Sequence, residues 1–241
     1  MSALTLRLIA CLSMLLDHIG FCLGIEPLRY VGRLAFPIYV FLMVNGFFYT
    51  KDRRRYALRF ALFAVLSQIP FALMSYRNAF DPRMNVMVTL LAGLLVIWLA
   101  ETMKEHKVWR WFCLVPAMLV YGAYYFNVIH SDYGDKGIVL AMVFWCFRDK
   151  KVWISLGTFF ALWSRYLVSC GLAPVFGRQL PVPTQWQMVQ MLSLLALPLI
   201  FLYNEKPGKM PTSPVWKKVV QYGFYVFYPL HMLLLWFFFG R

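Results

Sequence analysis

The stretch LIACLSMLLDHIG, residues 8 to 20, indicates which class of protein this is. It is an apolar run of the kind that spans a membrane as a helix, yet it contains the adjacent ionisable residues Asp17 and His18. An ionisable side chain at membrane depth is costly unless it faces the protein interior. No small-residue cleavage site follows the run, so we interpret it as a retained helix rather than a signal peptide. The stretch therefore predicts a helical membrane bundle with a polar site inside it.

The composition extends this prediction to the whole chain. Of the 241 residues, 61% are hydrophobic and 14% are charged, with a mean hydropathy of +0.63, whereas about a quarter of the residues of a soluble domain carry charge. We expect an all-α, polytopic integral membrane bundle that forms one domain over residues 1–241 and is surrounded by membrane lipids. Few residues remain for loops, so a separate soluble catalytic domain is excluded, as are collagen, disorder and nucleic-acid binding.

Nine apolar segments of about twenty residues each predict about nine transmembrane helices. The breaks between them combine proline, glycine and charge, which is typical of loops. The segment at 134–147 is short for a span, and whether it crosses fully, tilts inward or re-enters is left open. The expected helices cover residues 3–24, 30–50, 56–75, 86–103, 109–127, 134–147, 151–172, 186–203 and 216–239.

The formal net charge of +14 is interpreted as membrane topology rather than as a signal for an acidic partner. Fifteen lysines and arginines follow the even-numbered segments, and seven lie on the opposite side. Short cytoplasmic loops are rich in lysine and arginine, so the even-numbered loops and the N-terminus are expected in the cytoplasm. The five cysteines are widely spaced and form no zinc-type pattern with histidine, which predicts buried thiols and no metal site.

A small set of polar residues falls in the outer half of the expected helices or at their outer ends. His18 and His231 each lie fifteen residues past the start of a helix that runs outward, so both are expected at one depth. Arg165 is either part of a structural ion pair with an outer-loop aspartate or a donor to a substrate. The other members of the set are Asp17, Arg33, Asn85, Thr89, Asp132, Asp135 and Lys136.

Arg7 and His18 share one face of the first helix. They are eleven positions apart, which places them about 20° apart around the helix axis and roughly 16 Å apart along it. In the functional interpretation, Arg7 holds an anionic group that enters from the cytoplasm, while the thin end of a long ligand reaches His18. In the alternative interpretation, Arg7 is a flanking charge that extends to the lipid headgroups.

His18 is the expected general base, because an imidazole accepts a proton near neutral pH and a carboxylate commonly orients it. Asp17 is adjacent in sequence but about 100° around the helix, so we expect the orienting carboxylate from another segment, either Asp132 or Asp135. His231 would orient His18 or carry an acyl group as a covalent intermediate. The alternative for His18 is a core histidine satisfied by its neighbours.

Seven segments, in order along the chain, resemble the TraX family of integral membrane proteins, which is named for the conjugative pilin acetylation protein. The resemblance runs the full length, and the order and spacing of the segments make it specific. They are LIACLSMLLDHIG (8–20), GRLAFPIYVFLMVNGF (32–47), RYALRFALFAVLSQIPFAL (55–73), NVMVTLLAGLL (85–95), DYGDKGI (132–138), LALPLIFLYN (195–204) and FYVFYPLHMLLL (224–235).

The resemblance implies a multi-pass protein of the bacterial inner membrane that transfers an acetyl group from acetyl-CoA to an amine, in the namesake the N-terminus of a pilin subunit. Wider transmembrane acyltransferases, to which the family is similar, have a basic residue about ten positions before a catalytic histidine, and Arg7 and His18 are similarly spaced. The chain departs from the expected pattern at Asn45 and Ala72, where acidic or other polar groups are expected. The acceptor, a protein or a small amine, is therefore left open.

Together these inferences assign roles to nine residues. Arg33, Asn85 and Tyr228 are expected to donate to the developing oxyanion. The full assignment is His18, His231, Asp17 and Asp132 for catalysis, Arg7 for the coenzyme A thioester, and Arg33, Asn85, Arg165 and Tyr228 for the substrate. Two alternatives remain: a transporter with His18, Arg165 and His231 along its pathway, and a non-catalytic partner of a pilus or secretion assembly. The acyl chain length, the oligomeric state and the choice between direct transfer and an acetyl-histidine are also open.

Overall fold

The computed structural model describes residues 1–175, 177, 179–206, 208 and 213–240, and this part of the chain is all helical, with no named β-strand. The all-α fold class expected from the sequence is therefore confirmed. The elements, including two 3-10 helices η1 and η2, are α1 (Ala3–Leu23), α2 (Glu26–Gly32), α3 (Ala35–Tyr49), α4 (Arg53–Leu66), α5 (Gln68–Tyr76), α6 (Val86–Glu105), η1 (Trp109–Phe112), α7 (Val115–Tyr125), α8 (Gly134–Cys146), α9 (Lys151–Leu172), α10 (Gln185–Gln190), η2 (Met191–Leu195), α11 (Ala196–Phe201) and α12 (Pro214–Phe239).

Fewer helices than expected are long and apolar enough to cross a membrane. Among the described residues four segments qualify: α1, Glu26–Tyr49 (α2 with α3), α6, and Val215–Phe239 of α12. Helices α4 and α5 add a fifth if they are counted as one span bent by 42°. All nine expected segments contain helix, but α7 and α8 have only 11 and 13 residues, whereas a span needs about 20. By length and composition the structure supports four to five spans rather than nine.

Prolines account for two of the breaks. A proline has no N–H to bond to the carbonyl four residues earlier, which weakens a helix at that point. Pro70 cannot bond to the carbonyl of Leu66, the residue at which α4 ends. Pro37 cannot bond to the carbonyl of Arg33, which lies between α2 and α3. The bend between α4 and α5 and the break before α3 therefore follow from the sequence.

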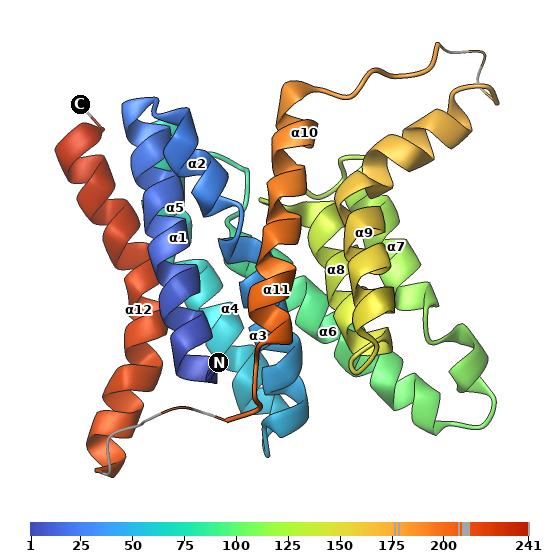
Figure 1. Cartoon of the computed structure of the whole chain (residues 1–241), viewed down its shortest axis with the longest axis horizontal. Helices are drawn as coiled ribbons and strands as arrows, with labels where there is room; N and C mark the ends of the chain where they lie inside the picture. The colour runs from blue at the N-terminus through green and yellow to red at the C-terminus, as the bar shows by residue number, and fades with distance from the viewer. Residues whose placement is uncertain (176, 178, 207, 209–212, 241) are drawn as a thin grey trace.

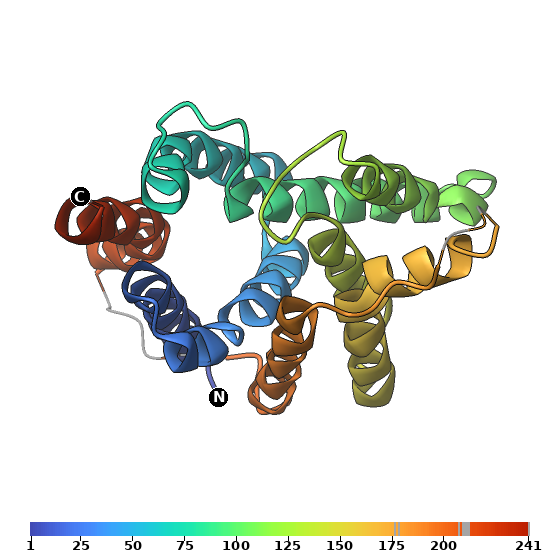
Figure 2. The same ribbon diagram turned by 90° about the horizontal axis from the view of Figure 1, so that it is seen from above.

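Five helices surround a common space in one half of the molecule. Figure 2 shows α12, α1, α3, α4 and α6 arranged as a ring, with α7, α8 and α9 in the other half. Helix α1 packs against α2, α3 and α12, and α6 packs against α4 and α8. Helices α1 and α12 begin at the same end of the bundle and run in the same direction (Figure 1). The ring therefore brings together the first and last helices of the chain.

The loop before α8 is anchored on α6. Thr89 Oγ1 lies 2.6 Å from Ser131 Oγ and donates to the backbone oxygen of Asp132 at 2.5 Å. Helix α8 also approaches α6 closely, since a Cβ on Gly137 would lie 2.3 Å from Thr89 Cγ2. Small residues permit such close helix packing in membranes. These contacts hold Asp132 and Tyr133 at the end of the bundle where α1 ends and α6 begins.

Candidate functional site

His18 on α1 and His231 on α12 are in direct contact. The His18 Nδ1 atom lies 2.7 Å from His231 Nε2, and the two rings are nearly parallel, with centroids 4.9 Å apart and an interplanar angle of 8°. His231 is 4% exposed. The two residues are 213 positions apart in sequence, and their contact confirms the prediction that they lie at one depth.

The hydrogen bonds of this histidine pair assign its protons. His231 Nδ1 lies 2.7 Å from the carbonyl oxygen of Phe227, which can only accept, so Nδ1 of neutral His231 carries the proton. His231 Nε2 then accepts a hydrogen bond from the Nδ1–H of His18. The other nitrogen of His18, Nε2, keeps its lone pair and has no hydrogen-bond partner among the described residues. His18 thus keeps one basic nitrogen with a free lone pair, whereas both nitrogens of His231 form hydrogen bonds.

The structure distinguishes between the partners that the sequence analysis offered His18. An orienting carboxylate from Asp132 or Asp135 was favoured and His231 was the alternative, and it is His231 that lies beside His18 Nδ1. The physical reason is the parallel course of α1 and α12, which places residues of equal height side by side. A histidine can replace a carboxylate in this role because its unprotonated nitrogen accepts the same hydrogen bond.

Asp17 is bound in an ion pair on another side of α1. Arg33 Nη2 lies 2.5 Å from both carboxylate oxygens of Asp17, and Arg29 Nε lies 3.8 Å from one of them. Arg33 Nη1 also donates to the hydroxyl of Tyr133 at 2.9 Å. Arg33 is 5% exposed. Both expected site residues therefore have structural partners, and together they join α1 to the turn after α2 and to the loop before α8.

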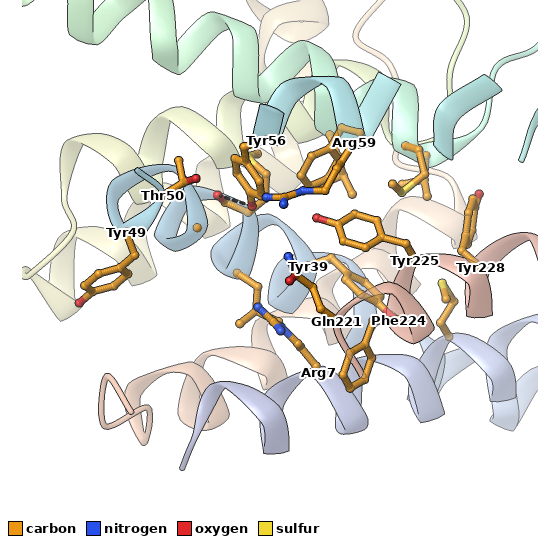
Figure 3. Close-up of a pocket in the computed structure, with 18 residues that line it drawn as sticks. Arg7, Tyr39, Tyr49, Thr50, Tyr56, Arg59, Gln221, Phe224, Tyr225 and Tyr228 are labelled. Carbon is orange, nitrogen blue, oxygen red and sulfur yellow. Dashed lines mark hydrogen bonds between the residues drawn. The ribbon is translucent and has the colours of Figure 1, made fainter. Parts of the chain in front are cut away.

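A cavity, here called the ring cavity, occupies the space between α1, α3, α4, α6 and α12. It measures about 1100 Å³, including the space open at its mouth. Figure 3 shows Arg7 and Arg59 projecting into it from opposite walls, with Tyr225 between them. The polar or aromatic residues of the wall are Arg7, Tyr39, Tyr49, Thr50, Tyr56, Arg59, Phe60, Gln221, Phe224, Tyr225 and Tyr228.

The ring cavity is cationic. Its wall contains no aspartate or glutamate, and neither Arg7 nor Arg59 forms an ion pair within the described part of the chain. Arg59 Nε is buried without a hydrogen-bond partner there, and the two guanidinium groups lie over Phe224 and Tyr56 at 5.8 Å and 5.4 Å. Unpaired arginines in a pocket suit an anionic ligand. Arg7 thus lines a cavity that can admit an anionic ligand.

Sequence analysis did not identify Arg59. It was grouped with the basic residues that mark a cytoplasmic loop, although the expected helix at 56–75 already included it. In the structure it lies in the middle of α4 and lines the cavity. The available signal was an arginine inside an expected apolar helix, three residues past its start at residue 56.

The ring cavity extends from the two arginines toward the histidine pair. Met14 and Tyr228 line its wall, and they precede His18 and His231 by four and three residues, which is about one helical turn. The rings of Tyr228 and His231 have centroids 6.0 Å apart. His18 itself is not part of the wall. Tyr228, an expected oxyanion donor, is therefore the predicted substrate residue that the structure places in this cavity.

Asn85, another expected substrate residue, is not part of the ring cavity wall. It caps the N-terminus of α6, and its side-chain amide donates to the backbone oxygen of Ala64 at 2.7 Å and to Gln68 Oε1 at 2.9 Å. Asn85 is 0% exposed. Both amide hydrogens are engaged, so the structure gives Asn85 a role in joining α4, α5 and α6.

A second cavity, here called the loop cavity, lies around the loop before α8. It measures about 590 Å³ including its open space, and its wall includes Tyr124, Asp132, Tyr133, Asp135 and Arg165. Arg165 donates to the backbone oxygen of Tyr125 at 3.1 Å and to Asn127 Oδ1 at 2.9 Å, and lies 3.9 Å from Asp135. Asp132 and Arg165 therefore lie together, apart from the ring cavity.

The side chain of Asp132 opens onto the loop cavity, and the protein that surrounds this cavity keeps bulk water from the carboxyl. This desolvation raises the pKa of Asp132 to about 6, against the opposing effect of Arg33. The group therefore titrates near neutral pH. Across the described ranges no cluster of three or more histidine, cysteine, aspartate or glutamate side chains is arranged to hold a metal ion.

Comparison with known proteins gives both a family and relatives. The family model described as TraX protein matches residues 2–238. The probable fimbrial assembly protein FimC, serogroup H1, of Dichelobacter nodosus is 26% identical over 254 residues, which covers 97% of this chain and 94% of that protein. An uncharacterised protein of Rickettsia prowazekii (strain Madrid E) is 24% identical over 161 residues, covering 66% of this chain and 61% of that protein. No solved structure matches.

Proposed function

The chain belongs to the TraX family, and on that premise we propose that it is an integral membrane acyltransferase that moves an acetyl group from cytoplasmic acetyl-CoA to an amine. The observation that carries the proposal is the ring cavity, which has two arginines without acidic partners and extends toward a histidine pair with a basic nitrogen. The distribution of lysine and arginine supports an orientation with the Arg7 end in the cytoplasm. The membrane is then the bacterial inner membrane, and the chain crosses it several times.

Acetyl-CoA matches the chemistry of the ring cavity. Its nucleotide end carries several phosphate charges, and arginine binds phosphate through planar, paired hydrogen bonds. Arg7 and Arg59 would hold that end. The narrow pantetheine arm would then lie along the aromatic and apolar wall, over the roughly 16 Å that separates Arg7 from His18 along α1. The thioester would reach the level of the histidine pair.

The histidine pair would supply the base for direct transfer. The amine nitrogen attacks the thioester carbonyl, His18 Nε2 takes the proton that this nitrogen loses, and a C–N bond replaces the C–S bond as the thiolate leaves. The proton on His18 then passes to the thiolate. His231 holds the His18 ring through Nδ1, and Tyr228 is the donor for the oxyanion. Both nitrogens of His231 are engaged, which favours direct transfer over an acetyl group carried on His231.

The proposed acceptor is the amino terminus of a pilus subunit. The family name and the relative called a probable fimbrial assembly protein support this choice. The same relative also favours a second candidate function, that of a non-catalytic component of fimbrial assembly. The two functions differ in coenzyme A binding, which only the acyltransferase requires.

Replacing Arg59 or Arg7 with glutamine is expected to weaken coenzyme A binding by about tenfold each, because a charge-assisted hydrogen bond to phosphate contributes about 1.5–3 kcal/mol. Calorimetry with the purified protein in detergent measures this. Arg54→Gln is the matched control, because Arg54 lies on the same helix but is exposed and outside the cavity wall. Equal affinity of the Arg59→Gln and Arg54→Gln proteins would contradict the proposed donor site.

A further inference from the structure

The loop cavity contains charges of both signs, but they are not equally paired. Arg83 lies 2.8 Å from Asp81 and stacks on Tyr76 at 3.4 Å. Arg165 donates hydrogen bonds to two oxygens that do not belong to the cavity carboxylates, namely the backbone oxygen of Tyr125 and Oδ1 of Asn127. The cations that line this cavity are therefore already engaged.

The carboxylates are less well satisfied. Asp132 forms no ion pair and no hydrogen bond to another side chain in the part of the chain that the structure describes. Asp135 is 6% exposed, and its Oδ2 atom is buried without a partner there. Its other oxygen is 3.9 Å from Arg165, which is a loose contact. A buried carboxylate oxygen without a donor is costly, so a ligand that supplies N–H donors would be favoured.

We propose that the loop cavity binds a primary ammonium group through Asp132, with the Asp135 carboxylate as the second anionic group and tyrosine rings as walls. An ammonium group has three N–H donors and no acceptor. This matches the Asp132 carboxylate, which is exposed to the cavity, and the Asp135 carboxylate, whose buried Oδ2 has no partner among the described residues. Tyr124 and Tyr133 complete the wall around the two carboxylates. For the transfer reaction this inference rests on the proposed function, because the bound ammonium is then the amino terminus of the acceptor. It gives one proton to the Asp132 carboxylate and then attacks the thioester as the neutral amine.

The loop cavity is linked to the segment of α1 that carries His18 through a chain of side-chain contacts. Tyr133 lines the cavity, its hydroxyl accepts from Arg33 at 2.9 Å, and Arg33 binds Asp17, the residue next to His18. Tyr133 has a φ of 59°, a left-handed conformation that is uncommon for a residue with a side chain. The side chains of Arg33 and Asp17 thus connect the proposed amine site to the reaction centre. In this arrangement the acceptor would approach from the side opposite to coenzyme A.

The test measures amine binding without any acyl donor. The probe is tetraglycine amide with a free amino terminus, and its control is the same peptide acetylated at that terminus. We expect the free peptide to bind at least about tenfold more tightly than the acetylated one, and Asp132→Asn to remove that preference. Asp132→Glu, which keeps the charge, should retain it, and Asp149→Asn, an exposed aspartate outside the cavity, should not change it.

The preference for the free amine should also depend on pH. Binding of the free amine needs the charged Asp132 carboxylate, which has a pKa of about 6. The affinity for the free peptide should therefore fall as the pH drops from 7.5 to 5. The charged and titratable groups around Asp132 are Asp17, Arg33, Tyr76, Arg83, Tyr124, His130, Tyr133, Asp135, Lys136 and Arg165. Histidines also change charge in this range, so the titration is made with the His130→Gln protein. The fall should persist there and disappear with Asp132→Asn.

Two outcomes overturn the inference. One is equal binding of the free and acetylated peptides to the unmodified protein, a measurement that needs no variant to fold. The other is an unchanged preference in Asp132→Asn. Coenzyme A binding, measured in parallel, separates this inference from the proposed function: loss of amine preference with intact coenzyme A binding rejects only the amine site, whereas absent coenzyme A binding rejects the acyltransferase.

Discussion

Replacement of His18 with alanine is expected to lower the rate of acyl transfer by about 10²- to 10⁴-fold, the usual contribution of a positioned general base. His18 Nε2 is the nitrogen of the pair that carries a free lone pair, since both nitrogens of His231 are engaged. The measurement is acetylation of a pilin peptide by the purified protein, followed by mass spectrometry. Coenzyme A binding should be retained, because Arg7 lies roughly 16 Å from His18 along α1 and Arg59 is on another helix, α4.

Variants of His231 distinguish a positioning role from a catalytic one. His231→Gln keeps an oxygen acceptor for the Nδ1–H of His18 and should retain most of the activity, whereas His231→Phe removes the acceptor and should lose much more. If His231 instead carried the acetyl group, the glutamine and phenylalanine variants would be equally inactive. Full acetylation by a normally expressed His18→Ala protein would disprove the assignment of the base.

Replacement of Arg33 with methionine is expected to destabilise the protein by about 3–5 kcal/mol, because it leaves a buried carboxylate without its partner. The side chains of Arg33 and Asp17 are 6% and 16% exposed, and Arg29 is only a distant second cation for Asp17. Thermal unfolding in detergent, followed by circular dichroism, measures the loss. The double variant Asp17→Asn with Arg33→Met should recover part of it, since no charge then remains uncompensated.

A surface pair provides the matched control for Arg33. Arg55 and Asp52 lie 3.0 Å apart at the start of α4, with side chains 84% and 47% exposed. Exposed ion pairs contribute about 0–1 kcal/mol, so Arg55→Met should hardly change the unfolding temperature. If Arg33→Met unfolds at the same temperature as Arg55→Met, the Asp17–Arg33 pair does not join the helices in the way described.

Helical structure and family were accessible from the sequence, but the number of spans was not. Apolar segments separated by charge and proline predict helices well, and all nine expected segments contain helix. Whether a segment crosses a membrane depends on uninterrupted length. The segment with Pro70 is bent between α4 and α5, and α7 and α8 are short, whereas α2 with α3 still qualifies as one span despite Pro37. The prolines were visible in the sequence, whereas the lengths of the ordered helices depend on where packing and capping end them.

The alignment of Arg7 with His18 was predictable, because both lie on α1 and helix geometry fixes their relation. The sequence by itself also determined the apolar, helical character of the chain and the equal height of His18 and His231. Only the tertiary structure decided that His231 orients His18, that Arg59 faces Arg7 across a cavity, and that Asp17 pairs with Arg33. These contacts join residues far apart in the chain, and a local pattern does not specify which helices become neighbours or which faces they turn toward each other.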